Sequence, residues 1–344
     1  MRFHVVGAGA IGGITGAFLA RNGEDVHFVD VVPEHVDAMN AQGLFVDGVA
    51  GEFRVRAPAS LPKGVAGPLD VVLLAVKTQY TMTALEGIEP YLGRASLVVS
   101  LQNGLNPDRI AARIGSDRVA GAFINFAADY IAPGHLRYGG VGDYYLGRLG
   151  GAPDARVSQI AEKFDKIMNT VLTDNIMGYL WAKECYGSLL IGTALVDAPV
   201  HEVLGVRENR EVLTAAVLEA VRVADASGVH IEPFEPFEPE LFRPPLDPAK
   251  LDAFYDRVAA RFKARVKQHT GIWRDLRIRR RKTEVEWLTG EVIRRGEQRG
   301  ISLPINTRLI EMIAEIERGE REQDWKNLRE LHGSMSRGQI NISH

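Results

Sequence analysis

The stretch FHVVGAGAIGGITGAFLA, residues 3–20, decides the fold of the first part of the chain. It begins with a short apolar run typical of a buried strand, passes through a glycine-rich turn, and continues with apolar residues at helical spacing. Gly7, Gly9 and Gly12 form the pattern G-x-G-x-x-G between the expected strand and the expected helix. In that context the pattern predicts a loop that holds the pyrophosphate of a dinucleotide at the helix N-terminus.

Each position of this loop has its own physical role. Gly7 permits the tight turn, Gly9 lets the backbone approach a pyrophosphate, and Gly12 lets the helix pack closely on the strand. Ala10 and Ile11 open the helix, where unpaired N–H groups and the positive end of the helix dipole favour a phosphate. We therefore expect these five residues to bind a cofactor. A glycine-rich turn without a ligand is the alternative.

An acidic residue ends the second expected strand, DVHFVD (residues 25–30). A carboxylate at Asp30 can accept hydrogen bonds from the 2′-hydroxyl of an adenosine ribose, and it repels a 2′-phosphate. Val31, Val32 and Pro33 supply no basic side chain for that phosphate. The sequence thus favours NAD(H) over NADP(H), although Asp30 could instead be a helix N-cap or a loop aspartate.

Strand-like and helix-like segments alternate through the first half. The strand-like segments are residues 3–8, 25–30, 69–77 and 95–104, and the helix-like segments are residues 14–23 and 34–43. This alternation implies a parallel sheet with helices on both faces. The run VVLLAV lacks polar alternation, as expected of a strand buried on both faces. The sequence therefore predicts an α/β fold with a Rossmann domain over residues 1–173.

The second half is mostly helical in pattern, beginning with a cap at Asp174 or Asn175. The expected helices cover residues 176–196, 209–228, 249–269, 282–300 and 304–321. They predict an all-helical domain over residues 174–344. The proline-rich segment 231–248 is expected to be an ordered, irregular loop, either a cover over a cleft or a surface loop without a role.

Composition excludes several classes of protein. The chain has 344 residues, enough for two domains. Its formal net charge of −3 gives no overall electrostatic attraction to nucleic acid or to an anionic membrane. It has one cysteine, Cys185, and no apolar run long enough to span a membrane. We expect a cytoplasmic protein. The basic run RIRRRK (residues 277–282) is expected to be a solvated helix face, with nucleic-acid binding as the alternative.

Four residues are candidates for chemistry. Lys77 and Asn103 follow strand-like runs, at the sheet edge where ligands of open α/β sheets bind; a solvent-directed lysine and a simple turn are the alternatives. Lys183 lies inside an apolar helix, where it must either reach solvent or face a polar cleft; in a cleft, desolvation would lower its pKa and make it a proton donor. Glu284 lies near the start of another expected helix, where a dipole-stabilised carboxylate is the alternative.

An ordered set of motifs resembles the ketopantoate reductases (2-dehydropantoate 2-reductases). The motifs are GAGAIGG (7–13), VVLLAVKTQ (71–79), LQNG (101–104), PGHLRYGGVGDYYLGRL (133–149), LWAK (180–183) and KTEVEWLTGEVIRRGEQRGISLPINTRL (282–309). The resemblance implies a Rossmann domain joined to a helical domain like that of 6-phosphogluconate dehydrogenases, with the active site between them. It also implies a small 2-oxo or 2-hydroxy acid substrate, NADP(H) as the usual cofactor, and a homodimer.

The resemblance also implies residue roles. Lys183 matches the catalytic lysine, and Glu284 matches the glutamate that binds substrate. Lys77 and Asn103 match residues that contact cofactor and substrate. Asp275 matches an aspartate upstream of the glutamate, which implies that it contacts substrate. The substrate carboxylate is expected to bind Thr270 or Arg274.

The chain departs from the family pattern at several positions. Gly187 and Ile191 stand where asparagines are common, Gly271 stands where a serine is usual, and the segment 275–284 is one residue longer. These departures and Asp30 leave reversible hydride transfer as the expected reaction. They also leave two alternatives, a catabolic NAD-dependent hydroxy-acid dehydrogenase with another substrate and a non-catalytic NAD-sensing protein.

Overall fold

The computed structural model describes residues 1–140, 142–264 and 267–336. The chain divides into two compact units, unit 1 (Met1–Met177) and unit 2 (Gly178–His344). The division falls in the first turn of helix α6 (Ile176–Thr193), a few residues after the boundary expected at residue 174. None of the described helices is long and apolar enough to cross a bilayer.

Unit 1 is built on an eight-stranded sheet in the order β12-β11-β8-β7-β6-β1-β2-β5. Its strands are β1 (Arg2–Val6), β2 (Asp25–Val29), β5 (Ala59–Ser60), β6 (Leu69–Leu74), β7 (Leu92–Ser100), β8 (Val119–Ile124), β11 (Tyr144–Arg148) and β12 (Thr170–Leu172). Neighbouring strands pair in parallel except β8 and β11, which are antiparallel. The predicted parallel sheet is therefore present from β5 to β8, with β11 and β12 added at one edge.

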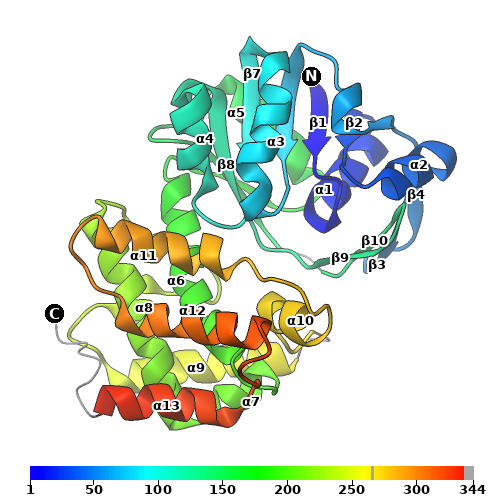
Figure 1. Cartoon of the computed structure of the whole chain (residues 1–344). Coiled ribbons are helices and arrows are strands. Elements are labelled where there is room, and N and C mark those ends of the chain that lie inside the picture. Colours follow the sequence, from blue (N-terminus) through cyan, green and yellow to red (C-terminus); the bar gives the residue numbers. More distant parts are fainter. Residues whose placement is uncertain (141, 265–266, 337–344) are drawn as a thin grey trace. The chain divides into compact units, whose positions relative to one another are not determined.

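Helices cover both faces of this sheet (Figure 1). The helices of unit 1 are α1 (Ala10–Arg21), α2 (Pro33–Gln42), α3 (Thr81–Ile88), α4 (Asn106–Ile114) and α5 (Ala155–Asp165). Val5 and Val99 belong to the core formed with α1 and α5. Their chain neighbours Val6 and Val98 belong to the core formed with α3 and α4. Adjacent residues of a strand thus lie on opposite faces of the sheet, and both faces are buried. This explains why the central strands are apolar without alternation.

A second sheet of four strands packs against α1. Its order is β4-β3-β10-β9, with β3 (Leu44–Gly48), β4 (Phe53–Val55), β9 (Ala128–Ala132) and β10 (His135–Tyr138). The Tyr138 ring meets the Phe18 ring of α1 edge-on, with centroids 5.3 Å apart. The sequence did not predict this sheet, because its strands are short and the central pairing joins Phe45 to His135, far along the chain.

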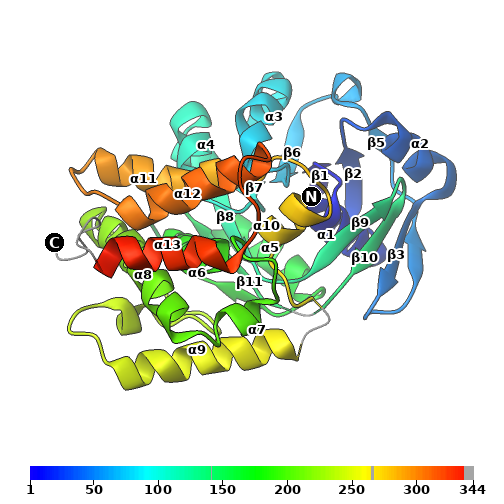
Figure 2. The same ribbon diagram turned by 60° about the horizontal axis from the view of Figure 1, so that its bottom comes forward.

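Helices form unit 2, as predicted. They are α6, α7 (Val200–Val203), α8 (Arg207–Ala226), α9 (Pro248–Lys263), α10 (Gly271–Arg277), α11 (Thr289–Glu297), α12 (Pro304–Glu317) and α13 (Trp325–Ser336). Helix α8 packs against α11, α12 and α13 (Figure 2). Two expected helices differ clearly. The helix expected over 249–269 ends at Lys263, and residues 267–269 are not helical. Residues 282–284 are not helical either, Val285–Trp287 form a 3₁₀ turn, and α11 begins only at Thr289.

The proline-rich segment 231–248 is irregular but packed. Its side chains Phe234, Phe237 and Phe242 are buried, and the last two stack with centroids 5.6 Å apart. Phe242 meets Phe254 of α9 edge-on at 5.3 Å, and Phe234 meets Tyr186 of α6 at 5.8 Å. The segment is therefore part of the core of unit 2, because its aromatic face joins α6 to α9.

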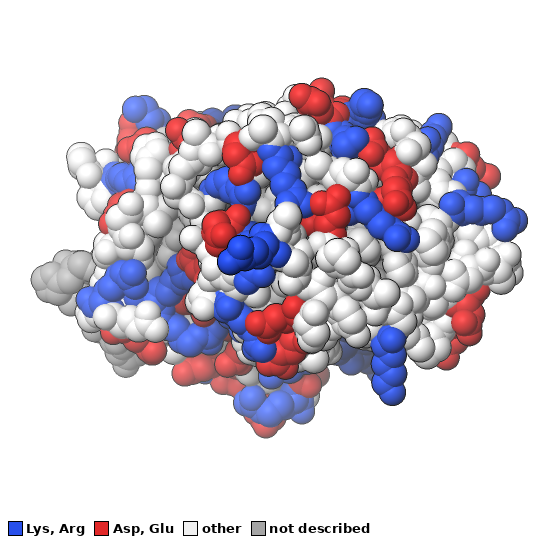
Figure 3. Space-filling model, turned by 90° about the horizontal axis from the view of Figure 1, so that it is seen from above, with Lys and Arg blue, Asp and Glu red and all other residues white. Residues whose placement is uncertain are grey.

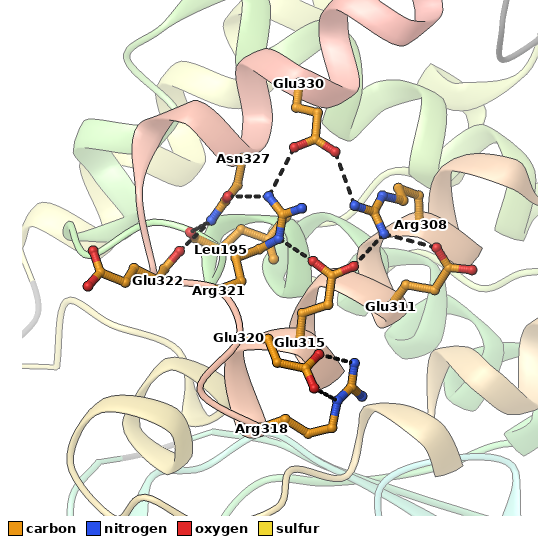
Figure 4. A network of polar contacts seen from close by, with 10 residues as sticks. All are labelled: Leu195, Arg308, Glu311, Glu315, Arg318, Glu320, Arg321, Glu322, Asn327 and Glu330. Carbon is orange, nitrogen blue, oxygen red and sulfur yellow. Dashed lines mark hydrogen bonds and ion pairs between the residues drawn. The ribbon is translucent and has the colours of Figure 1, made fainter.

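A network of ion pairs ties α12 to α13 (Figure 4). Arg308 donates to Glu315 at 2.7 Å and to Glu330 at 3.0 Å. Arg321 donates to the same two carboxylates, with 3.0 Å to Glu330. The hydrogen bond from Arg321 is the main reason why the pKa of Glu315 lies below its usual 4.5. Two arginines and two carboxylates thus form a closed ring.

Replacing Arg321 with methionine is expected to remove about 1–3 kcal/mol of unfolding free energy at pH 7, because two carboxylates lose a shared partner. A carboxyl group with a lowered folded-state pKa stabilises the fold above its unfolded pKa, and this contribution disappears as pH falls through the folded value. The variant should therefore show a smaller loss of stability on acidification. Denaturant unfolding at pH 7 and pH 4 measures both effects.

Arg318 provides the matched control, since its pair with Glu320 is solvent-exposed. Arg318→Met should leave both quantities nearly unchanged. Equal acid sensitivity of the wild type and Arg321→Met would show that the ring does not stabilise the fold.

Candidate functional site

The glycine loop of unit 1 has the geometry of a phosphate-binding turn. Gly7 has φ +93°, and a Cβ there would lie 2.8 Å from the Val76 nitrogen. A Cβ on Gly12 would lie 2.2 Å from the Gly7 carbonyl oxygen. A Cβ on Gly9, by contrast, would meet no atom within 4 Å. The turn and the helix contact therefore require glycine, while the space in front of Gly9 is open for a ligand.

The N-terminus of α1 fits an anion. Gly9 is the N-cap residue and supplies no side-chain hydrogen bond, and the first turn contains no acidic residue. Ala10 and Ile11 are partly exposed, so the first N–H groups of the helix are accessible. Together with the helix dipole, these N–H groups can hold the pyrophosphate of a dinucleotide.

Asp30 is part of the same loop structure. It follows β2, and its Oδ2 accepts a hydrogen bond from the Ala8 N–H at 2.8 Å, while Oδ1 accepts one from the Val32 N–H at 3.0 Å. Val32, not Asp30, is the N-cap residue of α2. A carboxylate oxygen can accept more than one hydrogen bond, so both oxygens retain capacity for ribose hydroxyls.

His35 binds the other main-chain polar group of Ala8, a role that sequence reasoning missed. The Gly134 N–H donates to Nδ1 of His35 at 2.9 Å, so the proton of this buried ring is on Nε2. Nε2 then donates to the Ala8 carbonyl oxygen at 2.9 Å. Asp30 and His35 thus fix both polar groups of Ala8. A lone histidine in an amphipathic segment gave no signal of this contact.

Lys77 and Asn103 lie at the carboxyl ends of neighbouring strands. They follow β6 and β7, which pair in parallel up to Leu74 and Ser100. Asn103 is exposed. Its main-chain carbonyl oxygen accepts hydrogen bonds from Asn106 Nδ2 at 2.6 Å and Thr78 Oγ1 at 2.8 Å. The structure therefore brings both candidates to one edge of the sheet.

A buried polar cluster, also missed from sequence, supports these two strand ends. Its members are Thr78, Thr81, Gln102 and Asn106. Gln102 Nε2 donates to the Val76 carbonyl and to Thr81 Oγ1, both at 2.8 Å. Because every member is buried and hydrogen-bonded, the cluster holds the chain that carries Lys77 against the chain that carries Asn103.

Lys183 of unit 2 lies in α6 between buried neighbours and is itself partly exposed. Burial lowers the pKa of its amine from 10.5 to about 8, and the charges of Glu184 and Glu284 oppose that shift. Glu284 is thus within electrostatic range of Lys183, although the two are far apart in sequence. A lysine with this pKa can donate a proton near neutral pH.

The segment that carries Glu284 is fixed by its neighbours. The N–H and hydroxyl of Thr283 both donate to Glu317 Oε1 at 2.7 Å. Asp275, which is 4% exposed, accepts from Arg279 at 2.7 Å and from Arg281 at 3.0 Å. These contacts explain why residues 282–284 are not helical. Asp275 holds the turn before Glu284, and its expected contact with substrate stays a prediction.

The same contacts account for the basic run 277–282. It is not a helix face beyond Arg277, and Arg277 itself pairs with Asp197 at 2.9 Å. Arg279 and Arg281 are paired with Asp275. Positive and negative side chains are also intermixed on the face shown in Figure 3.

Thr270 has a structural role. It is buried, and its hydroxyl accepts a hydrogen bond from the Trp273 N–H at 3.2 Å, which makes it the N-cap of α10. The hydroxyl proton can still donate to another group. The expected binding of a substrate carboxylate by Thr270 or Arg274 stays a prediction.

A dinucleotide loop on one unit and a lysine with a carboxylate partner on the other define a class, the two-domain oxidoreductases with a dinucleotide cofactor. Residues 3–151 match the family model described as ketopantoate reductase PanE/ApbA. Residues 175–317 match the model of its C-terminal domain. The chain belongs to the ketopantoate reductase family, as its motifs predicted.

The chain is similar to known 2-dehydropantoate 2-reductases and to solved structures over most of its length. The 2-dehydropantoate 2-reductase of Pyrococcus abyssi is 28% identical over 314 residues, which cover 89% of this chain and 94% of that protein. A PanE/ApbA family ketopantoate reductase from Ralstonia eutropha JMP134 is 28% identical, covers 93% of this chain and 99% of its own, and has a TM-score of 0.78.

The fold is also shared with D-mandelate dehydrogenase, whose structure contains NADH and anilino(oxo)acetate. That chain is 22% identical, with a TM-score of 0.79 over 93% of this chain and 99% of its own. Family membership makes the protein an oxidoreductase that acts on CH–OH or keto groups with a nicotinamide cofactor.

Proposed function

We propose that the protein interconverts a 2-oxo acid and its 2-hydroxy acid with NAD(H), and that Lys183 is the general acid of the reduction. The main support for this proposal is Lys183, which is partly buried and whose pKa is lowered to about 8 near the carboxylates of Glu184 and Glu284. The names of the relatives, 2-dehydropantoate 2-reductases, support a small 2-oxo acid as substrate. When bound, the nicotinamide supplies the hydride for reduction and accepts it in oxidation.

The residues of unit 2 handle the proton and the substrate. Negative charge develops on the carbonyl oxygen during reduction, and the Lys183 ammonium stabilises that charge and delivers the proton. Glu284 accepts a hydrogen bond from the 2-hydroxyl of the reduced acid and orients the ammonium. Thr270 or Arg274 binds the substrate carboxylate, and Asp275 completes this substrate-binding set.

The residues of unit 1 hold the cofactor. Gly7, Gly9, Ala10, Ile11 and Gly12 form the loop for its pyrophosphate, supported by the open space before Gly9. Lys77 and Asn103 align the nicotinamide and the substrate. The homodimer and the cytoplasmic location expected from the sequence stay predictions.

Turnover tests this proposal. Steady-state oxidation of NADH and NADPH is measured with a panel of 2-oxo acids that includes 2-dehydropantoate, and the reverse reaction with 2-hydroxy acids. We expect reduction of at least one 2-oxo acid. Tight binding of NADH without turnover of any acid would instead support a non-catalytic NAD-sensing protein.

Asp30 is proposed to set a preference for NADH over NADPH. Its carboxylate lies where the ribose 2′-hydroxyl of NADH would bind, and a 2′-phosphate would meet a like charge. Replacing Asp30 with asparagine keeps an acceptor for the Ala8 N–H but removes the charge. Because a like-charge contact costs several kcal/mol, we expect the ratio of kcat/KM for the two cofactors to fall by about 10–100-fold.

Asp25→Asn is the control, because Asp25 is an exposed carboxylate at the other end of β2. It should leave the ratio unchanged. A wild-type protein that prefers NADPH would contradict the assignment of Asp30.

A further inference from the structure

Helix α6 is buried except along one stripe. Its partly exposed residues are Met177, Tyr179, Lys183, Gly187 and Leu190. The last four are spaced by four, four and three positions, so they follow one face of the helix. The lysine that we propose as general acid therefore shares its accessible face with a residue that has no side chain and with an aliphatic one.

Gly187 lacks the packing reason that glycine usually has inside a helix. Gly192, later in the same helix, allows close contact, because a Cβ there would lie 2.3 Å from Leu213 Cδ2. A Cβ on Gly187 would meet no atom of the described residues within 4 Å. Glycine weakens a helix relative to alanine, so its presence here has a cost without a gain in packing. The absence of a side chain leaves open space one turn after Lys183.

The next accessible residue on this face of the helix is apolar. Leu190 follows Gly187 on the stripe, while Tyr186, beside it, is buried against Phe234 and Phe237. Ile191, which stands where the family commonly has an asparagine, is 3% exposed and belongs to the core of unit 2. The charged groups near Lys183 are Glu184 and Glu284.

We infer that the space over Gly187 receives the side chain of the 2-oxo acid, and that this side chain is bulky and apolar, either branched aliphatic or aromatic. The inference rests on the proposed function, since it takes Lys183 as the group that binds the carbonyl oxygen. The carbonyl carbon carries two other substituents. The carboxylate requires polar partners, so the remaining side chain is the one that suits the open space at Gly187 beside the aliphatic Leu190.

The test compares wild type, Gly187→Ala and Gly187→Leu with NADH and two sets of substrates. Pyruvate and 2-oxobutyrate are the small acids, and 4-methyl-2-oxopentanoate and phenylpyruvate are the bulky ones. We expect kcat/KM of the wild type to be about tenfold or more higher for the bulky acids. Gly187→Leu should lower kcat/KM for the bulky acids by about tenfold or more and change pyruvate by less than about threefold.

Gly187→Ala keeps the test valid if the leucine variant folds poorly. Alanine favours the helix, so its melting temperature should rise, while kcat/KM for the bulky acids falls less than in Gly187→Leu. Gly87→Leu is the matched control, because Gly87 lies in α3 and a Cβ there also meets no atom within 4 Å. It should leave the substrate preference unchanged.

The possible results distinguish the assignment of Gly187 from the proposed reaction. A wild type that prefers pyruvate, or a Gly187→Leu variant that loses activity equally on all acids, would overturn the assignment of Gly187 while the proposed reaction stands. A protein that reduces none of the 2-oxo acids would overturn the proposed function itself.

Discussion

Replacing Lys183 with methionine is expected to lower kcat for 2-oxo acid reduction by about 10²–10⁴-fold, the usual contribution of a positioned general acid. Methionine keeps the apolar stem in α6 but cannot stabilise charge on the carbonyl oxygen or deliver a proton. Binding of NADH, measured by fluorescence titration, should be retained, because the glycine loop lies in unit 1.

The pH dependence gives an independent check on Lys183. Its ammonium is the acid for reduction, and its pKa is about 8. Reduction should therefore be full below that pH and decline above it, whereas oxidation of the hydroxy acid, which needs the neutral amine, should rise through the same range. Because the charge of Glu284 raises this pKa, Glu284→Gln should move both limbs to lower pH.

A second lysine provides the control for Lys183→Met. Lys282 is an exposed lysine near Glu284 in sequence, and Lys282→Met should leave turnover and the pH profile unchanged. Full turnover by Lys183→Met with cofactor bound would remove Lys183 from the mechanism.

Replacing Glu219 with alanine is expected to lower the free energy of unfolding by about 3–5 kcal/mol. Glu219 of α8 is fully buried. Its carboxylate accepts from the N–H groups of Ile305 and Asn306 at 2.9 Å and from the Asn306 side chain at 2.8 Å. It thus caps the N-terminus of α12 from another helix. Without it, these buried donors lose their partner.

Denaturant unfolding measures this loss, and the same helix offers a control. Glu211 of α8 is more than half exposed and pairs with His332. Glu211→Ala should change the unfolding free energy by no more than about 0.5 kcal/mol. A loss below about 1 kcal/mol in Glu219→Ala would show that α12 does not depend on this cap.

The sequence was most informative where local order determines structure. The loop at Gly7, Gly9 and Gly12 follows from spacing alone, because turn, strand and helix are adjacent in the chain. The parallel core followed from apolar runs that alternate with helices. Lys183 was recognisable because a charged side chain within an otherwise apolar helix is costly to bury without a polar partner.

Contacts between distant segments could not be predicted. Nothing near Glu219 indicates that it caps a helix about ninety residues further on. The pattern around Glu284 is helical, yet Thr283 is tied to Glu317 and the turn before it is fixed by Asp275. The clamp on Ala8 by His35 and the second sheet likewise depend on partners far along the chain, which a single sequence does not reveal.

The two-sided clamp on Ala8 has a consequence for changing cofactor preference. The carboxylate that would recognise the ribose is also the acceptor for the N–H of the phosphate loop. Recognition of the sugar can therefore be altered at Asp30 without disturbing the loop only by a residue that keeps an acceptor for the Ala8 N–H, such as asparagine. A basic substitution designed to accommodate NADPH would weaken the grip on both cofactors, unless a second change restored an acceptor for Ala8. In evolution as in the laboratory, a switch of cofactor that places a basic residue at this loop requires paired mutations.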